Sequence, residues 1–326
     1  MRRTVLVVLV AAVLGACATG APSTDTPRAV SAPDYLEEAL ALLDDGLHAG
    51  TDAWAAARED AVEQVTAATS IADVHAVVDR LATIAGGPHS TFRTPEEVRA
   101  WEAESADTPD LPSVEVDVDV GVLTLPPFPV DEPELVQQYV DAGLAGIAEH
   151  TDADLCGWVI DVQFNTGGNA HPMIAAASPL LTDGPVLGLR EQDGTVTELV
   201  VDGNSVLVDD QVLAVGSGDP FKVSTPSVAV RQGRMTASAG EAVVVAFSGE
   251  ATARTFGAPT RGFTSGNRYL ELSDGAGLTV TTGLFQDRRG TAYDGRLAPG
   301  IEGADAVTAA DGLTEEEWIR ERCSRR

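Results

Sequence analysis

The apolar positions of the chain follow two patterns, one helical and one that alternates between strand and helix. Over residues 34–87 apolar side chains recur at spacings of three and four, which is typical of amphipathic helices, and Gly86 and Gly87 end the last of these. Another short helix is expected to start near Pro95. This part predicts a small helical bundle over residues 34–110.

From residue 111 the pattern predicts an α/β core that ends near residue 310. An apolar strand at 157–162 is followed by a glycine-containing turn and a helix, an order typical of a parallel sheet with crossover helices. Turn residues separate β-rich runs between 186 and 215, which predicts a β-hairpin insert there. Residues 311–326 are expected to form a C-terminal helix or tail.

The N-terminus has the pattern of an export signal over residues 1–16. Two arginines precede an apolar run that is too short for a stable membrane span, and small residues end it. The run 14–17 resembles the lipobox of bacterial lipoproteins, which implies cleavage before Cys17 and a lipid on that cysteine. An ordinary signal peptide and an uncleaved anchor are the alternatives. Residues 17–33 have the composition of a flexible tether, so we expect an exported protein on the outer face of the cytoplasmic membrane.

The charge of the chain limits the kinds of molecule that it can bind. The formal net charge of −29 argues against nucleic acid as a partner.

Two cysteines besides Cys17 leave two alternatives open. Cys156 and Cys323 can form a disulfide in an oxidising compartment, or they can remain two thiols with Cys156 buried. No cluster has metal-ligand spacing and no glycine-rich phosphate motif occurs, so neither a metal nor a cofactor is expected.

Ser238 stands in a run of small residues between two apolar segments. Small neighbours allow a substrate to approach, and the amides that open a following helix can stabilise an oxyanion, so the position suits a nucleophile. The same composition is also typical of a helix N-cap. The segment alone leaves both interpretations open.

Four segments stand in a characteristic order along the sequence. They are 86–90, 159–168, 236–241, and 256–263 with 290–299 after it. Together they resemble the serine peptidase family that includes the C-terminal processing proteases, the tricorn protease core and the interphotoreceptor retinoid-binding protein modules. The third segment matches the family's nucleophile motif residue for residue. The resemblance implies an α/β core of the ClpP/crotonase type.

The resemblance also implies roles for individual residues. Ser238 would attack the scissile carbonyl, and the amide of Ala239 with an amide of Gly167 or Gly168 would form the oxyanion hole. Phe263 stands where the tail-specific branch has its lysine base, so a lysine dyad is not expected.

The tricorn-like branch instead uses an N-terminal histidine and a C-terminal glutamate. His89 and Asp294 fall at these positions, and a carboxylate that fixes the imidazole tautomer would let the other ring nitrogen accept the serine proton. Asp294 can also be a simple turn residue before Gly295. No PDZ-type segment is found between bundle and core, so recognition of peptide tails by such a domain is not expected.

Two functions follow from these observations. The first is a membrane-anchored serine endopeptidase that acts on extended peptides or proteins. The second is a catalytically weak or inactive module that binds a hydrophobic ligand or peptide on the same fold. The complete motif around Ser238, together with His89, favours the peptidase. The substrate and the oligomeric state stay open.

Overall fold

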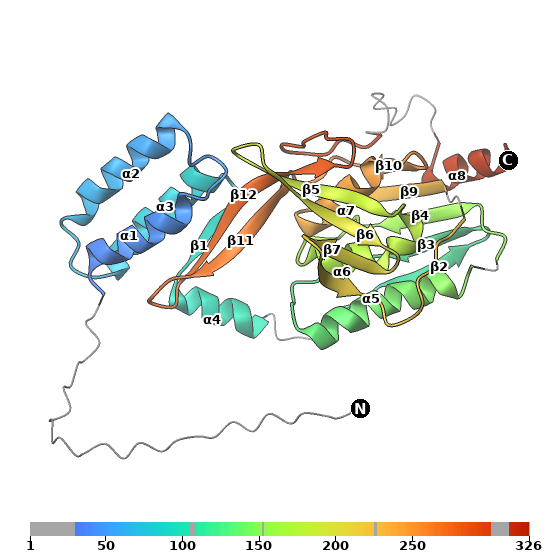
Figure 1. Ribbon diagram of the computed structural model, residues 1–326, viewed down its shortest axis with the longest axis horizontal. Coiled ribbons are helices and arrows are strands. Elements are labelled where there is room, and N and C mark those ends of the chain that lie inside the picture. The colour runs from blue at the N-terminus through green and yellow to red at the C-terminus, as the bar shows by residue number, and fades with distance from the viewer. Residues whose placement is uncertain (1–29, 105–108, 152, 225–226, 301–312, 326) are drawn as a thin grey trace, which may run out of the picture.

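The fold is taken from a computed structural model, which describes residues 30–104, 109–151, 153–224, 227–300 and 313–325. The expected signal, Cys17 and most of the expected tether lie outside the described residues. Figure 1 shows a helical bundle at one end, a layered α/β core at the other, and long strands that run between them. Within the described ranges no helix has the length and apolar character needed to cross a membrane.

The bundle consists of α1 (Ala32–Leu43), α2 (Asp52–Val65) and α3 (Ala72–Gly86). The first helix begins at Ala32, inside the expected tether, because Ser31 caps it by accepting a hydrogen bond from the Asp34 amide. The buried faces of the three helices pack together and against Leu278 and Val280. A short strand, β1 (Thr91–Arg93), and α4 (Pro95–Glu104) follow.

A five-stranded sheet forms one layer of the core. Its strands are β2 (Ser113–Asp117), β3 (Val120–Thr124), β4 (Gly157–Asp161), β9 (Ser227–Gln232) and β10 (Ala253–Gly257), in the order β10-β9-β4-β3-β2. All neighbours are parallel except β2, which forms an antiparallel hairpin with β3. Because β4 and β9 are parallel neighbours, the segments that follow their carboxyl ends leave the sheet on the same side.

A seven-stranded antiparallel sheet forms the second layer. It contains β5 (Gly184–Glu191), β6 (Val196–Asp202), β7 (Ser205–Val208) and β8 (Gln211–Val215), which are the strands of the expected hairpin insert. Strand β12 (Gly277–Asp287) pairs with β5, β1 and β11 (Ser265–Glu271). Because β12 packs on the bundle at Leu278 and on the core at Phe285, it links the two ends of the molecule (Figure 1).

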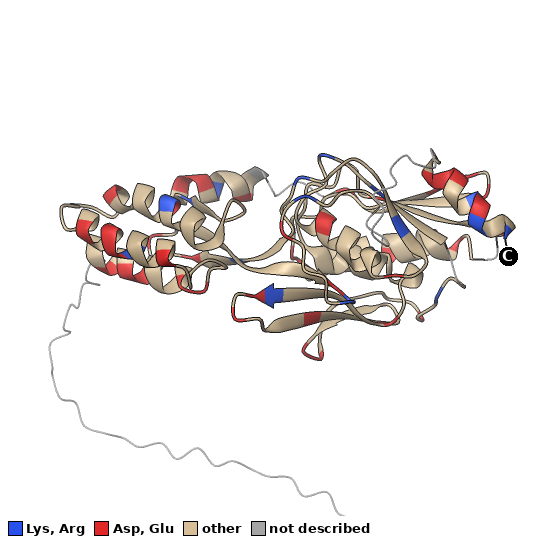
Figure 2. Ribbon diagram, turned by 90° about the horizontal axis from the view of Figure 1, so that it is seen from above, with Lys and Arg blue, Asp and Glu red and all other residues tan. Residues whose placement is uncertain are grey.

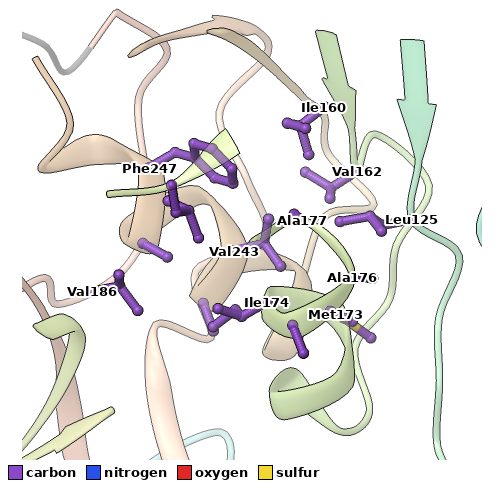
Figure 3. Packing of buried hydrophobic residues seen from close by; sticks show 14 of the residues in the cluster. Leu125, Ile160, Val162, Met173, Ile174, Ala176, Ala177, Val186, Val243 and Phe247 are labelled. Carbon is purple, nitrogen blue, oxygen red and sulfur yellow. The ribbon is translucent and has the colours of Figure 1, made fainter. Parts of the chain in front are cut away.

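Helices α5 (Pro133–Ala148), α6 (Ala170–Ala176) and α7 (Ala239–Ser248) lie between the sheets, with a 3-10 turn at Ser178–Leu180. Every residue of α7 is buried, as expected for a helix that is apolar around most of its circumference. Figure 3 shows Val243 and Phe247 of α7 packed among side chains of α6 and the strands.

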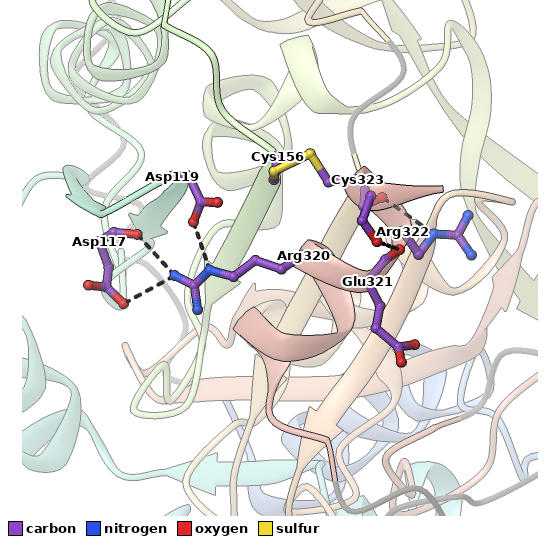
Figure 4. The surroundings of a disulfide bond; sticks show 9 residues. Asp117, Asp119, Cys156, Arg320, Glu321, Arg322 and Cys323 are labelled. Atoms are coloured by element: carbon purple, nitrogen blue, oxygen red, sulfur yellow. Dashed lines mark hydrogen bonds and ion pairs between the residues drawn. A yellow bond between two sulfur atoms is a disulfide. The ribbon is translucent and has the colours of Figure 1, made fainter. Parts of the chain in front are cut away.

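The C-terminal helix α8 (Glu315–Ser324) covers the opposite face of the five-stranded sheet, where Trp318 and Ile319 pack on Val159. A disulfide joins Cys156 to Cys323, so the paired alternative is the one that the structure contains (Figure 4). The predicted fold class, an α/β core with hairpin strands that follows a helical bundle, is confirmed.

Candidate active site

Ser238 is the N-cap of α7, directly after a tight turn that follows β9. Its backbone has φ +52° and ψ −116°, a conformation that residues with a Cβ rarely adopt. Such a conformation persists only where the surrounding structure holds it, and it is common at functional sites. The side chain is half-buried at the carboxyl edge of the parallel strands.

Buried Thr236 holds the turn before Ser238. Its hydroxyl donates to the carbonyl of Val162 at 2.8 Å and accepts from the amide of Gly233 at 2.8 Å. The Ala237 amide donates to the carbonyl of Asn165 at 3.0 Å. These bonds fix the turn to the chain that follows β4.

The side chain of Asn165 determines which backbone amides beside Ser238 are free to donate a hydrogen bond to a substrate. Its Oδ1 accepts the amide of Gly167 at 2.9 Å. Within the described residues, the amides of Gly168 and Ala239 have no intramolecular acceptor. Gly167, with φ +117°, also allows a close approach, since a Cβ there would lie 2.9 Å from the Cβ of Ser238. Of the amides expected to form an oxyanion hole, that of Gly167 is therefore engaged by Asn165, whereas those of Ala239 and Gly168 are not.

Glu241 connects the Ser238 turn to the segment 260–263. Its fully buried carboxylate accepts from the amides of Ser238 at 2.9 Å, Phe263 at 2.7 Å and Gly262 at 2.8 Å. The hydroxyl of Thr260 is a fourth donor. Burial raises the pKa of Glu241, and the four hydrogen bonds oppose that rise because they favour the charged form.

His89 lies between α3 and β1 and reaches the same region from the bundle. Its ring stacks on the ring of Phe263, with centroids 4.6 Å apart and planes 6° apart. Its Nδ1 is 2.9 Å from Oγ of Ser265, and burial lowers its pKa to about 4, so the ring is neutral at pH 7. Phe263 and Ser238 donate to the same oxygen of Glu241. In the described part of the chain, no hydrogen bond joins the Ser238 hydroxyl to the His89 ring.

Asp294 is exposed and forms no hydrogen bond or ion pair within the described residues. Its two neighbours in sequence do contact the site region, because the carbonyls of Tyr293 and Gly295 accept hydrogen bonds from the hydroxyl of Thr264. The partner of the His89 ring is nevertheless Ser265. No motif in the sequence marks Ser265, whose one signal is its place two residues after Phe263.

Lys222, the one lysine of the sequence, has its partners outside this region. Lys222 donates to the carbonyls of Ser178 and Leu181 and pairs with Asp183 at 2.8 Å, so its ammonium group is engaged elsewhere. Among the residues that the structure describes, no group of three or more His, Cys, Asp or Glu side chains could hold a metal ion.

Residues 119–303, which include Ser238 and both oxyanion candidates, match the model of Peptidase family S41. The chain belongs to peptidase family S41. His89 lies outside the matched residues, because the bundle precedes them. The S41 assignment agrees with the serine peptidase resemblance found in the sequence.

Other proteins resemble this S41 member over most of its length. A nisin-resistance protein from Lactococcus lactis subsp. lactis is 23% identical over 288 residues, which cover 88% of this chain and 86% of that protein. The structure of a lipoprotein from Streptococcus agalactiae has a TM-score of 0.71 at 21% identity and covers 90% of this chain and 97% of its own. The photosystem II D1 C-terminal processing protease has a TM-score of 0.59 at 14% identity, with coverage of 89% and 97%. The two structures share the fold.

Substitution of Gly167 tests the close packing beside Ser238. In Gly167→Ala the new Cβ would press on Ser238, so we expect the rate of labelling by a fluorophosphonate to fall roughly 100-fold. Gly184→Ala is the matched control, because Gly184 also has a positive φ, +106°, but nothing lies within 4 Å of its added Cβ. The control should lose about 1 kcal/mol of stability and keep its labelling rate. Equal rates in both variants would contradict the packing argument.

The buried His89 ring predicts a pH dependence of stability. Its pKa is lowered from 6.5 to about 4 in the folded protein, so between these values the unfolded chain binds the proton more readily. The free energy of unfolding should therefore rise with pH across this window, by roughly 2 kcal/mol from this residue. Urea denaturation of native protein and His89→Gln at several pH values isolates the contribution, since all other groups are common to both. Identical slopes would show that burial does not perturb His89.

Proposed function

We propose that the chain is an extracytoplasmic serine endopeptidase, anchored by a lipid on Cys17, that cleaves extended peptides with Ser238 as nucleophile and His89 as general base. The observation that carries the proposal is the strained backbone of Ser238 at the start of α7, beside the unengaged amides of Ala239 and Gly168. A structural N-cap has no need of this conformation, because caps normally have extended backbone angles.

The proposed reaction uses two half-reactions. Nε2 of His89 accepts the proton of Ser238 while Oγ attacks the carbonyl carbon, and the oxyanion is stabilised by the two amides and by the positive end of α7. His89 then gives this proton to the leaving amine as the carbon–nitrogen bond breaks. In the second half-reaction a water molecule gives a proton to His89 and attacks the acyl group, and the proton returns to Ser238. Serine–histidine hydrogen bonds commonly tighten only in the substrate complex.

Ser265 has the position that a carboxylate has in a complete triad. When Nδ1 carries the proton and donates to Ser265, Nε2 is free to act as a base. A hydroxyl stabilises the imidazolium less than a carboxylate does, and burial lowers the pKa of His89 as well. We therefore infer a slower acylation step than in a serine–histidine–carboxylate site.

Two comparisons support the setting of this activity. The Lactococcus lactis relative is named a nisin-resistance protein, and this name supports a peptide substrate outside the cytoplasm. The fold shared with a lipoprotein supports the lipid anchor on Cys17. The proposed partners are therefore a peptide or protein substrate and the membrane. Nucleic acid is not proposed as a partner.

Fluorophosphonate labelling tests the proposal. The native protein should be labelled, Ser238→Ala should not, and His89→Ala should be labelled about 1000-fold more slowly because the general base is lost. Ser70→Ala and His150→Ala, on the bundle surface and at the end of α5, are matched controls that should retain the native rate.

Two results would defeat the proposal. Label that persists in Ser238→Ala would assign the nucleophile elsewhere. A folded native protein without label at neutral and mildly alkaline pH would favour the binding module.

A further inference from the structure

Three exposed arginines gather around the turn that precedes Ser238. Arg234 is part of this turn. The amide of Arg261 donates to the carbonyl of Thr236 at 2.9 Å, so its backbone lies directly against the turn. Arg296 comes next to Arg261, because a Cβ on Gly262 would lie 3.1 Å from both the Cγ and the amide nitrogen of Arg296. The cluster is defined as Arg234, Arg261 and Arg296.

These arginines are unpaired in a strongly acidic protein. The chain has 50 acidic and 21 basic side chains, and Figure 2 shows many acidic residues along the bundle helices and α8. Several other arginines pair with carboxylates, as Arg231 does with Asp161 and Arg320 with Asp119. Within the described residues, no member of the cluster forms an ion pair. Three guanidinium groups therefore remain available to an external anion.

Arg261 is also fixed relative to the candidate base. Its guanidinium carbon lies 5.3 Å from the ring centroid of Phe263, the ring on which His89 stacks. A cation at this distance from an aromatic face is held by electrostatic attraction. The planar guanidinium has a fork of donors that matches a carboxylate in bidentate geometry.

We propose that Arg234, Arg261 and Arg296 form a subsite for a carboxylate of the peptide substrate, close to the bond that is cleaved. The inference rests on the proposed peptidase function and specifies its substrate class. The carboxylate belongs to an acidic side chain or to the C-terminus of the peptide.

Binding to the uncleaving variant Ser238→Ala tests the subsite without any need for turnover. Fluorescence anisotropy would compare short apolar peptides that differ only by Glu or Gln at one scanned position, each with a free or an amidated C-terminus. At one position, or at the free C-terminus, we expect about fivefold tighter binding of the charged form. Added salt should reduce this preference by screening.

Arginine substitutions on the same background locate the effect. Arg261→Gln should bring the ratio of the two dissociation constants towards one, while Arg261→Lys should keep part of the preference because it keeps the charge. The matched control is Arg80→Gln. Arg80 is an exposed arginine of α3 that faces Asp60 at 3.5 Å, and its loss should leave the ratio unchanged.

The possible outcomes separate the subsite from the proposed function. Equal binding of Glu and Gln peptides, binding of neither, or a preference that survives Arg261→Gln would overturn the subsite, even where the native protein reacts with the fluorophosphonate. A charge preference that depends on Arg261 supports the subsite. Absence of fluorophosphonate labelling then affects only the claim of catalysis.

Discussion

The buried carboxylate of Glu241 is the interaction on which the candidate site depends. A carboxylate without exposure is stable only when its oxygens are hydrogen-bonded, and here the four donors come from Ser238 and from residues 260–263. The same group therefore fixes the amide of the candidate nucleophile and the backbone of Phe263. Since Phe263 carries the stacked ring of His89, one buried charge organises both sides of the site.

The position of His89 depends on how the bundle is attached to the core. Strand β12 contributes to both hydrophobic clusters, and β1, just after His89, pairs with it. At the far end of the bundle, Asp274 accepts from Tyr35 and is 2.8 Å from Nε2 of His75, which fixes the β11–β12 turn to the helices. The segment that follows the N-terminal helices thus brings His89 towards a candidate site whose other residues lie in the S41 core.

The sequence predicted the parts of the site that depend on local pattern. The small residues around Ser238, the glycines after β4 and the apolar run of α7 are each visible in a short window. Partners that are distant in sequence could not be predicted in this way. The contact of His89 with Ser265 joins residues 176 positions apart, and the engagement of the Gly167 amide depends on where the side chain of Asn165 points. The motif position of Asp294 gave no information on its solvent exposure.

The unpaired arginines show the same limit. Arg234, Arg261 and Arg296 are separated in sequence and become neighbours only because β9, the segment 260–263 and the chain after β12 meet at one edge.

The most direct test of the proposed site is a crystal structure of the protein after reaction with a fluorophosphonate. The account predicts phosphorus on Oγ of Ser238, with the phosphoryl oxygen about 2.7–3.1 Å from the amides of Ala239 and Gly168. Phosphorus on another residue, or an oxygen bound by neither amide, would contradict it.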